Sequence, residues 1–189
     1  MTDESYTRVA IGSRPHDLDA VSSRTGGRIT IEQVSLLAQV ALRLDPALAG
    51  RVPYPLPLEP NTAWETDARA ALRLGPDEWL VLGPHDTAAD IVDELDSSLD
   101  GEHRSVIDVS ANRVVIELGG ARRFELLAGG CSLDLHPRSW RAGMCAQTLF
   151  ARTQLILHER AGTTRLLVRP SFADYLIDRL LVALESEPA

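Results

Sequence analysis

Residues 68–99 read ARAALRLGPDEWLVLGPHDTAADIVDELDSSL and contain the strongest local signals of the chain. Two apolar segments, Ala68–Leu74 and Trp79–Leu82, flank Gly75-Pro76-Asp77-Glu78, in which Pro and Asp stand where a type I turn favours them. This pattern predicts a β-hairpin. The next segment, Thr87–Leu99, repeats apolar residues at helical spacing. The sequence therefore predicts a hairpin followed by a helix that packs on its sheet.

The remainder of the chain continues this alternation of strands and helices. Further strands are predicted over Ser105–Val109 and its expected partner Arg113–Leu118, over the hairpin Ala146–Ala151 with Gln154–His158, and over Arg165–Val168. Further helices are predicted over Ala121–Leu127 and Ser171–Leu184. Strands with packed helices in this order predict an α+β fold with mixed or antiparallel sheets.

A strand, a proline and then a helix occur together twice in the chain. Trp79-Leu80-Val81-Leu82-Gly83-Pro84 precedes the first of these helices, and Leu166-Leu167-Val168-Arg169-Pro170 precedes the second. The repetition predicts two related units, as in a duplicated ferredoxin-like arrangement. In the last helix, the residues expected to form the buried stripe are Phe172, Leu176, Leu180 and Leu184.

The N-terminal third is less regular. Residues 1–32 have few large apolar side chains and predict a flexible arm, which either gains order on a partner or stays a frayed terminus. Residues 33–186 are expected to form a single α+β domain. Within that domain, residues 34–44 fit a strand by alternation and a helix by spacing, and we favour the strand. The proline-rich residues 52–61 predict an extended connector that could also serve as a docking strip.

Composition narrows the classes of partner and chemistry. The formal net charge of −8 argues against nucleic acid and against an anionic membrane surface as partners. Lysine is absent from the sequence, which excludes Schiff-base and P-loop lysines. Cys131 and Cys145 do not form a CxxC pair, so we expect reduced thiols. With no apolar run near the ~20 residues that a membrane span needs and no apolar leader, a cytoplasmic location is expected.

Several motifs carry a resemblance to a known family. They are LGPDEWLVL at 74–82, DVSANR at 108–113, ELGGA at 117–121, CSLDLHP at 131–137, GMCAQT at 143–148 and QLILH at 154–158. Together they resemble the gamma subunit of heterotetrameric sarcosine oxidase, over about residues 37–184. The resemblance implies a non-catalytic subunit that helps to assemble the complex, with alpha, beta and delta subunits as its partners. Whether the chain itself counts as an enzyme is left open.

The same resemblance implies the chemistry of the complex. Sarcosine would be oxidatively demethylated to glycine, with formation of hydrogen peroxide and of formaldehyde or 5,10-methylenetetrahydrofolate. FAD, FMN, NAD, zinc and tetrahydrofolate are expected on the partner subunits, and no cofactor is expected on this chain.

A more distant resemblance leads to the alternative function. The Asp-Val-Ser turn and the strand–proline–helix ending look like the folate-binding fold of glycine-cleavage T proteins. In that superfamily an acidic residue on the hairpin near residues 149–158 serves the folate chemistry, whereas this chain has Arg152-Thr153-Gln154 there. A neutral amide cannot stabilise a cationic intermediate as a carboxylate does, which argues against folate chemistry in this chain. A stand-alone folate-binding or aminomethyl-transfer protein is kept as the alternative function, because of the resemblance in fold.

No residue is singled out as catalytic, cofactor-binding or metal-ligating, because the five histidines show no metal-site spacing and no serine lies in a nucleophile motif. The predicted partner contact is Arg138, Trp140 and Arg141, with His136 beside them, since Arg and Trp are enriched at binding hot spots. A solvated surface loop is the other interpretation of this segment, and a structural role is the other interpretation of His136.

Overall fold

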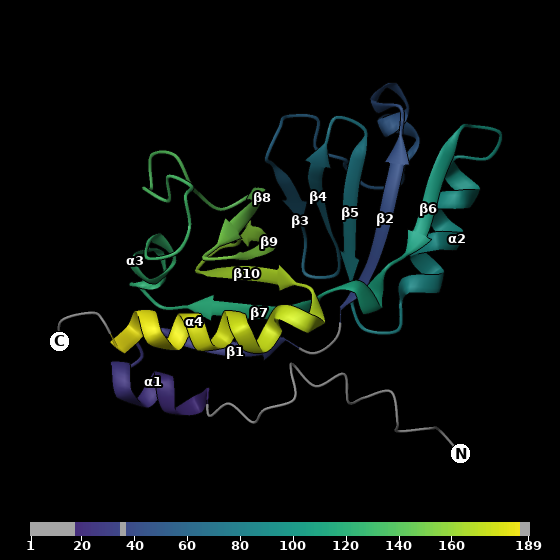
Figure 1. The fold of residues 1–189 in the computed structure, drawn as a ribbon. Helices are drawn as coiled ribbons and strands as arrows, with labels where there is room; N and C mark the ends of the chain where they lie inside the picture. The colour runs from purple at the N-terminus through teal and green to yellow at the C-terminus, as the bar shows by residue number, and fades with distance from the viewer. Residues whose placement is uncertain (1–17, 35–36, 186–189) are drawn as a thin grey trace, which may run out of the picture.

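Two antiparallel sheets of five strands make up the fold (Figure 1). The computed structural model describes residues 18–34 and 37–185. Sheet A has the order β1 (Thr30–Val34), β7 (Val114–Gly119), β10 (Thr163–Val168), β9 (Thr153–Glu159) and β8 (Met144–Phe150). Sheet B has the order β3 (Ala63–Glu65), β4 (Ala70–Gly75), β5 (Glu78–Gly83), β2 (Ala38–Leu44) and β6 (Arg104–Asp108). The predicted α+β class is confirmed.

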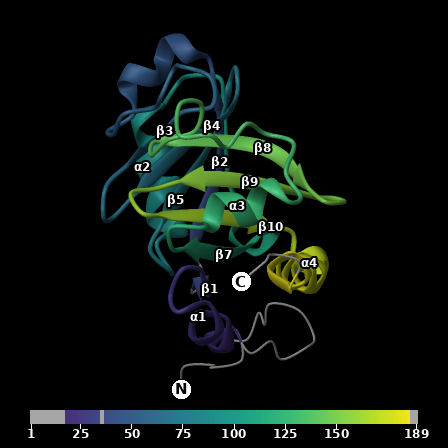
Figure 2. The same cartoon turned by 90° about the vertical axis from the view of Figure 1, so that its left-hand side faces the viewer.

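Four α-helices and three short 3₁₀ helices accompany the sheets in the described residues. The α-helices are α1 (Asp19–Thr25), α2 (Ala88–Ser98), α3 (Arg123–Ala128) and α4 (Ala173–Glu185). The 3₁₀ helices are η2 (Pro46–Arg51), η3 (Ser110–Asn112) and η4 (Pro170–Phe172). Figure 2 shows β8, β9, β10 and β7 stacked one beside the next, with α4 seen end-on at their side. None of the helices in residues 18–34 and 37–185 is long and apolar enough to cross a membrane.

The hairpin and helix predicted within residues 68–99 form as predicted. Strands β4 and β5 pair as a hairpin, and α2 follows with Ile91 and Leu95 fully buried. These side chains lie in one core cluster with Trp79 and Val81 of β5. The indole Nε1 of Trp79 donates to the carbonyl of Pro57 at 2.9 Å, so the largest side chain of this core keeps its polar atom satisfied.

The predicted pairing of Ser105–Val109 with Arg113–Leu118 is wrong, because the two strands lie in different sheets. Strand β6 is an edge of sheet B and leaves Ile107 55% exposed, whereas β7 lies between β1 and β10. A strand whose side chains are buried on both faces belongs in the middle of a sheet, and β7 is such a strand. The chain therefore crosses from one sheet to the other through η3.

Hydrogen bonds fix this crossing. The carboxylate of Asp108 accepts from the backbone N–H and the hydroxyl of Ser110, at 2.9 and 2.6 Å. The Ser110 hydroxyl oxygen accepts from the Gln39 N–H at 3.0 Å, and the Gln39 amide donates to the carbonyl of Arg113 at 2.7 Å. The crossing is thus tied to β2, and Asp108 caps the turn, as its position before Ser suggests.

The prediction of a flexible arm over residues 1–32 is wrong for residues 18–32. Helix α1 and strand β1 belong to the fold, and Val21, Ile29 and Ile31 are buried in the core of sheet A. Sparse apolar residues are enough here because Ile31 lies in β1, which pairs with β7, and Ile29 lies just before that strand, with both side chains buried. The part of the predicted arm at residues 1–17 lies outside the described residues.

The last helix differs from its prediction at one position. Leu176 and Leu180 are fully buried and Leu184 partly so, but Phe172 lies in η4 before the helix begins and is 45% exposed. Ala173 and Ile177 complete the buried face. The stripe shifts because Pro170 starts a 3₁₀ turn, which changes the direction in which position 172 faces.

The proline-rich segment forms no helix, as predicted, and one of its faces is buried. Leu58 on this segment is 52% exposed, and the role of the segment as a docking strip stays a prediction. The side chains of Val52, Tyr54 and Leu56 are buried and pack in the core of sheet B. Alternating apolar residues between prolines therefore bury one face of the segment against its own domain.

The two sheets share a core. Ile156, Leu167 and Val115 of sheet A lie in one cluster with Leu72, Leu80 and Leu82 of sheet B, and all six are buried. Side chains of both sheets thus pack against each other. This packing fixes where the polar residues at the edges of the contact between the two sheets lie.

We expect Gly120→Ala to be far more destabilising than Gly162→Ala. Both glycines have a φ near +90°, so each substitution has a similar backbone strain, about 1–2 kcal/mol. A Cβ at Gly120 would also lie 2.2 Å from the carbonyl oxygen of Arg28, whereas nothing lies within 4 Å at Gly162. Overpacking against backbone adds about 1–3 kcal/mol. Denaturant unfolding of both variants measures the difference, and equal losses would show that residues 28–29 are not packed on β7.

Candidate functional site

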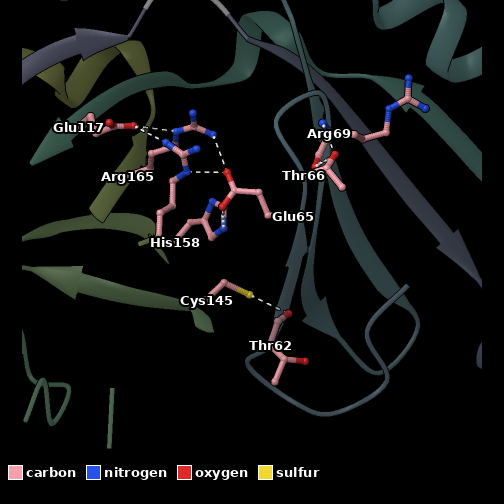
Figure 3. A network of polar contacts seen from close by, with 9 residues as sticks. Thr62, Glu65, Thr66, Arg69, Glu117, Cys145, His158 and Arg165 are labelled. Carbon is pink, nitrogen blue, oxygen red and sulfur yellow. Dashed lines mark hydrogen bonds and ion pairs between the residues drawn. The ribbon is translucent and has the colours of Figure 1, made fainter. Parts of the chain in front are cut away.

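Four charged side chains form a network where β3 of sheet B meets sheet A (Figure 3). Arg160 donates to Glu65 at 2.5 Å and to Glu117 at 3.2 Å. Arg165 donates to Glu117 at 3.0 Å, and its Nη1 lies 3.8 Å from a Glu65 oxygen. Two carboxylates and two guanidiniums balance each other, and all four side chains are at most 26% exposed. The network therefore holds the edge strand β3 of sheet B against sheet A.

His158 lies beside this network and is fully buried. Its Nε2 is 3.7 Å from a Glu65 oxygen, and neither ring nitrogen has a hydrogen-bond partner. Burial lowers the pKa of His158 to about 3, and the charges of Arg165 and Arg160 act in the same direction. The imidazole is therefore neutral at pH 7 and has no route to a substrate in solvent.

A cavity of about 230 Å³ opens at the rim of the network. Its walls include Glu65, Arg160 and Arg165 together with Thr66 and Arg69. Since Arg69 is itself paired with Glu94, all three arginines that line this cavity are engaged with acids of the chain.

The two cysteines are free thiols, as expected. Cys145 is fully buried, and its Sγ lies 3.3 Å from the carbonyl oxygen of Thr62. Burial raises the pKa of the Cys145 thiol to about 12, so the thiol is protonated at neutral pH and is a poor nucleophile. Across residues 18–34 and 37–185, no three His, Cys, Asp or Glu side chains are grouped so that they could hold a metal ion.

Trp140 is not exposed, which corrects the prediction that it contacts a partner. It is only 4% exposed and belongs to the core of sheet A. Its Nε1 donates to the buried carboxylate of Glu159 at 3.2 Å. Glu159 also accepts from Arg123 at 2.7 Å and from the Thr164 hydroxyl at 2.5 Å. An indole between two arginines in the sequence thus serves to satisfy a buried acid.

His136, Arg138 and Arg141 are exposed on the loop that leads to β8. The loop is held by its own polar groups: the carboxylate of Asp134 accepts from the His136 N–H at 3.0 Å, and His136 Nδ1 accepts from the Arg138 N–H at 3.2 Å. Hydrogen bonds from the Ser139 hydroxyl and the His136 N–H lower the pKa of Asp134. His136 therefore shapes the loop, and its predicted contact with a partner stays a prediction.

Sequence reasoning missed a larger cavity, of about 520 Å³, at the other end of sheet A. Arg113 and Arg169 line it, together with Gln147, Leu149 and Gln154. A sequence pattern that could have indicated this cavity is present in three segments. In each of them, residues two apart on one face are polar, apolar and polar in turn. These sets are Gln154, Ile156 and His158; Arg165, Leu167 and Arg169; and Arg113, Val115 and Glu117. Without the strand register, the three sets cannot be aligned into rows.

Comparisons with known proteins agree with this architecture. The family model described as "Sarcosine oxidase, gamma subunit family" matches residues 41–184. A sarcosine oxidase subunit gamma of Corynebacterium sp. strain P-1 is 33% identical over 87% of this chain and 85% of its own length. Another, from Arthrobacter sp., is 32% identical over 85% of this chain and 82% of its own length.

Solved structures give the same result. A chain of the heterotetrameric sarcosine oxidase of Corynebacterium sp. U-96 superposes with a TM-score of 0.77 at 30% identity, covering 85% of this chain and 88% of that chain. The glycine cleavage aminomethyltransferase T of Bartonella henselae has a TM-score of 0.63 at 15% identity, covering 82% of this chain and 45% of that chain, which is a likeness of fold alone. On these grounds the chain belongs to the sarcosine oxidase gamma subunit family.

Proposed function

We propose that the chain is the gamma-type subunit of a cytoplasmic heterotetrameric sarcosine oxidase and that its role is assembly, not catalysis. The observation that carries this proposal is the match of almost the whole fold to a chain of such an oxidase, with a TM-score of 0.77. Two free thiols in a chain without a disulfide suit a reducing compartment.

The polar interior supports a structural role. Glu65, Glu117 and Glu159 each accept hydrogen bonds from arginines of the same chain. A buried ion pair that is fully hydrogen-bonded fixes geometry, and its charges are not available to a substrate. Cys145 and His158 are both buried and neutral at pH 7, so neither is placed to act as a nucleophile or a base on a substrate in solvent.

The reaction then belongs to the assembled complex. We propose that the complex oxidatively demethylates sarcosine to glycine, and that the alpha, beta and delta subunits bind FAD, FMN, NAD, zinc and tetrahydrofolate. In this proposal the exposed loop residues His136, Arg138 and Arg141 contact one of these partners, since exposed arginines are frequent at interfaces.

We expect the chain to co-elute with its larger partner subunits and to increase the recovery of active enzyme. The measurement is co-expression with and without the chain, followed by size-exclusion chromatography and a peroxide-coupled sarcosine assay. The chain alone should form no peroxide. Activity and flavin content should fall when it is omitted, because the larger subunits would lose a packing surface.

The alternative is a stand-alone folate-binding protein, which the fold likeness to aminomethyltransferase T favours. The resemblance to T proteins implies an acid on the hairpin of β8 and β9, where this chain has Arg152 in the turn and Gln154 in β9. Elution as a free species that binds tetrahydrofolate would overturn the assembly role and establish this alternative.

A further inference from the structure

One face of sheet A carries three parallel rows of side chains. The middle row, Ile156, Leu167 and Val115, is buried against sheet B. The row on one side is His158, Arg165 and Glu117, which belongs to the network described above. The third row lies on the other side of the middle row and consists of Gln154, Arg169 and Arg113. Each of them is two residues away in sequence from its neighbour in the middle row, so it faces the same side of the sheet. The cavity of about 520 Å³ is lined by all three of these residues, and none of its lining residues belongs to a strand of sheet B.

The two arginine-bearing rows differ in their charge balance. Arg165 and Arg160 are neutralised by Glu65 and Glu117. Arg113 and Arg169, in contrast, have no ion pair with any acid of the described residues, although both line the cavity. Glu78 is the acid whose charge acts on Arg113, but its carboxylate pairs with Arg43 at 2.9 Å.

The pair of arginines is unfavourable within the isolated chain. Burial lowers the pKa of Arg113, and the like charge of Arg169 lowers it further. A half-buried guanidinium beside a second one is stabilised by an anion placed between them, and a carboxylate fits the planar donors of arginine in a bidentate manner.

The surroundings of the pair suit a protein side chain. Leu149 lines the cavity and is 48% exposed, and Phe172, 45% exposed, donates its N–H to the Arg169 carbonyl at 2.9 Å. Gln147 and Gln154 line the same cavity, and Gln147 Nε2 donates to the carbonyl of Leu74 at 3.0 Å. Exposed apolar groups around a charged centre are the composition of a protein interface. The net charge of −8 makes this a local positive site on an acidic chain.

We propose that the Arg113–Arg169 cavity docks an Asp or Glu side chain of a partner subunit, with Leu149 and Phe172 packing against the same segment. This inference rests on the proposed assembly function and deepens it by naming the surface and the chemistry of its partner. It also differs from the contact predicted at His136, Arg138 and Arg141, so the two surfaces can be tested separately.

The test compares the affinity of variants for the complex that lacks this chain. Arg113→Gln with Arg169→Gln is expected to weaken binding about 30-fold or more, because it removes both partners of a desolvated carboxylate. Arg24→Gln with Arg28→Gln is the control, since it makes the same change in net charge near Gly120, at the opposite end of β7. This control should bind within about 2-fold of wild type. Raising the salt concentration should weaken wild-type binding more than that of the Arg113/Arg169 variant.

The outcomes separate this inference from the assembly function. If the wild-type chain does not bind the complex, the assembly function fails and the docking site with it. If wild type binds and the Arg113/Arg169 variant binds equally well, the docking site alone is overturned. Should the double variant not fold, Arg169→Glu decides, because this exposed position tolerates the change and reversed charge should weaken binding beyond 30-fold. Unchanged binding by a folded Arg169→Glu chain would equally reject the proposal.

Discussion

Replacing Glu159 with Ala is expected to lower the free energy of unfolding by about 3–5 kcal/mol. The carboxylate is 1% exposed and accepts hydrogen bonds from Arg123, Thr164 and Trp140. Its removal leaves the Arg123 guanidinium, whose side chain is only 14% exposed, without a counter-charge. It also leaves the indole N–H of Trp140 without an acceptor, and each unsatisfied buried group costs about 1–3 kcal/mol. Denaturant unfolding at pH 7 provides the measurement.

A neighbouring ion pair supplies the control. Arg122 and Glu125 pair at 2.6 Å at the start of α3, and the Glu125 side chain is 58% exposed. Glu125→Ala should cost no more than about 0.5 kcal/mol, because exposed pairs contribute little. The double variant Arg123→Met with Glu159→Leu should recover part of the loss, since it removes both buried charges together. Equal losses for Glu159→Ala and Glu125→Ala would mean that Glu159 is solvated in solution.

Local signals in the sequence were sufficient for the elements with strong periodicity. The hairpin β4–β5, the helix α2 and the hairpin β8–β9 follow directly from alternation, a turn tetrad and helical spacing. Pairing between distant strands could not be obtained in this way. The short link at Ser110–Asn112 suggested a hairpin, yet β6 and β7 join different sheets, because the contacts that decide this lie with β2 and β10.

The candidate site shows the same limit. The sequence predicts a partner contact for Trp140 because Arg and Trp are enriched at binding hot spots, whereas the acceptor that holds it in the core, Glu159, is 19 residues away in the chain. Glu65 reaches Arg160 across 95 residues, so the network cannot be recognised from spacing. Likewise, Arg113 and Arg169 become neighbours only through the pairing of β7 with β10. Which side chains meet at the edges of the contact between the two sheets depends on the register of the paired strands. The sequence pattern does not determine this register.

His158 makes a large contribution to the pH dependence of stability. Its pKa is about 3 in the folded chain against 6.5 for an ordinary histidine. Between these values the unfolded chain binds a proton that the folded chain does not, so stability rises with pH. The contribution is complete above pH 6.5 and is lost as the pH falls toward 3. The slope is about 1.4 kcal/mol per pH unit, which gives about 2 kcal/mol between pH 7 and pH 5.

We therefore expect His158→Leu to lose about 2 kcal/mol less stability than wild type when the pH is lowered from 7 to 5. Unfolding at both pH values gives this difference directly, and carboxylates that titrate in the same range cancel because they are present in both proteins. His103→Leu is the control, since His103 is exposed and should leave the wild-type difference in place. An identical pH dependence in wild type and His158→Leu would mean that the imidazole protonates in the folded state. In that case Glu65, 3.7 Å from its Nε2, would accept an ion pair with His158 that outweighs the opposing charges of Arg160 and Arg165.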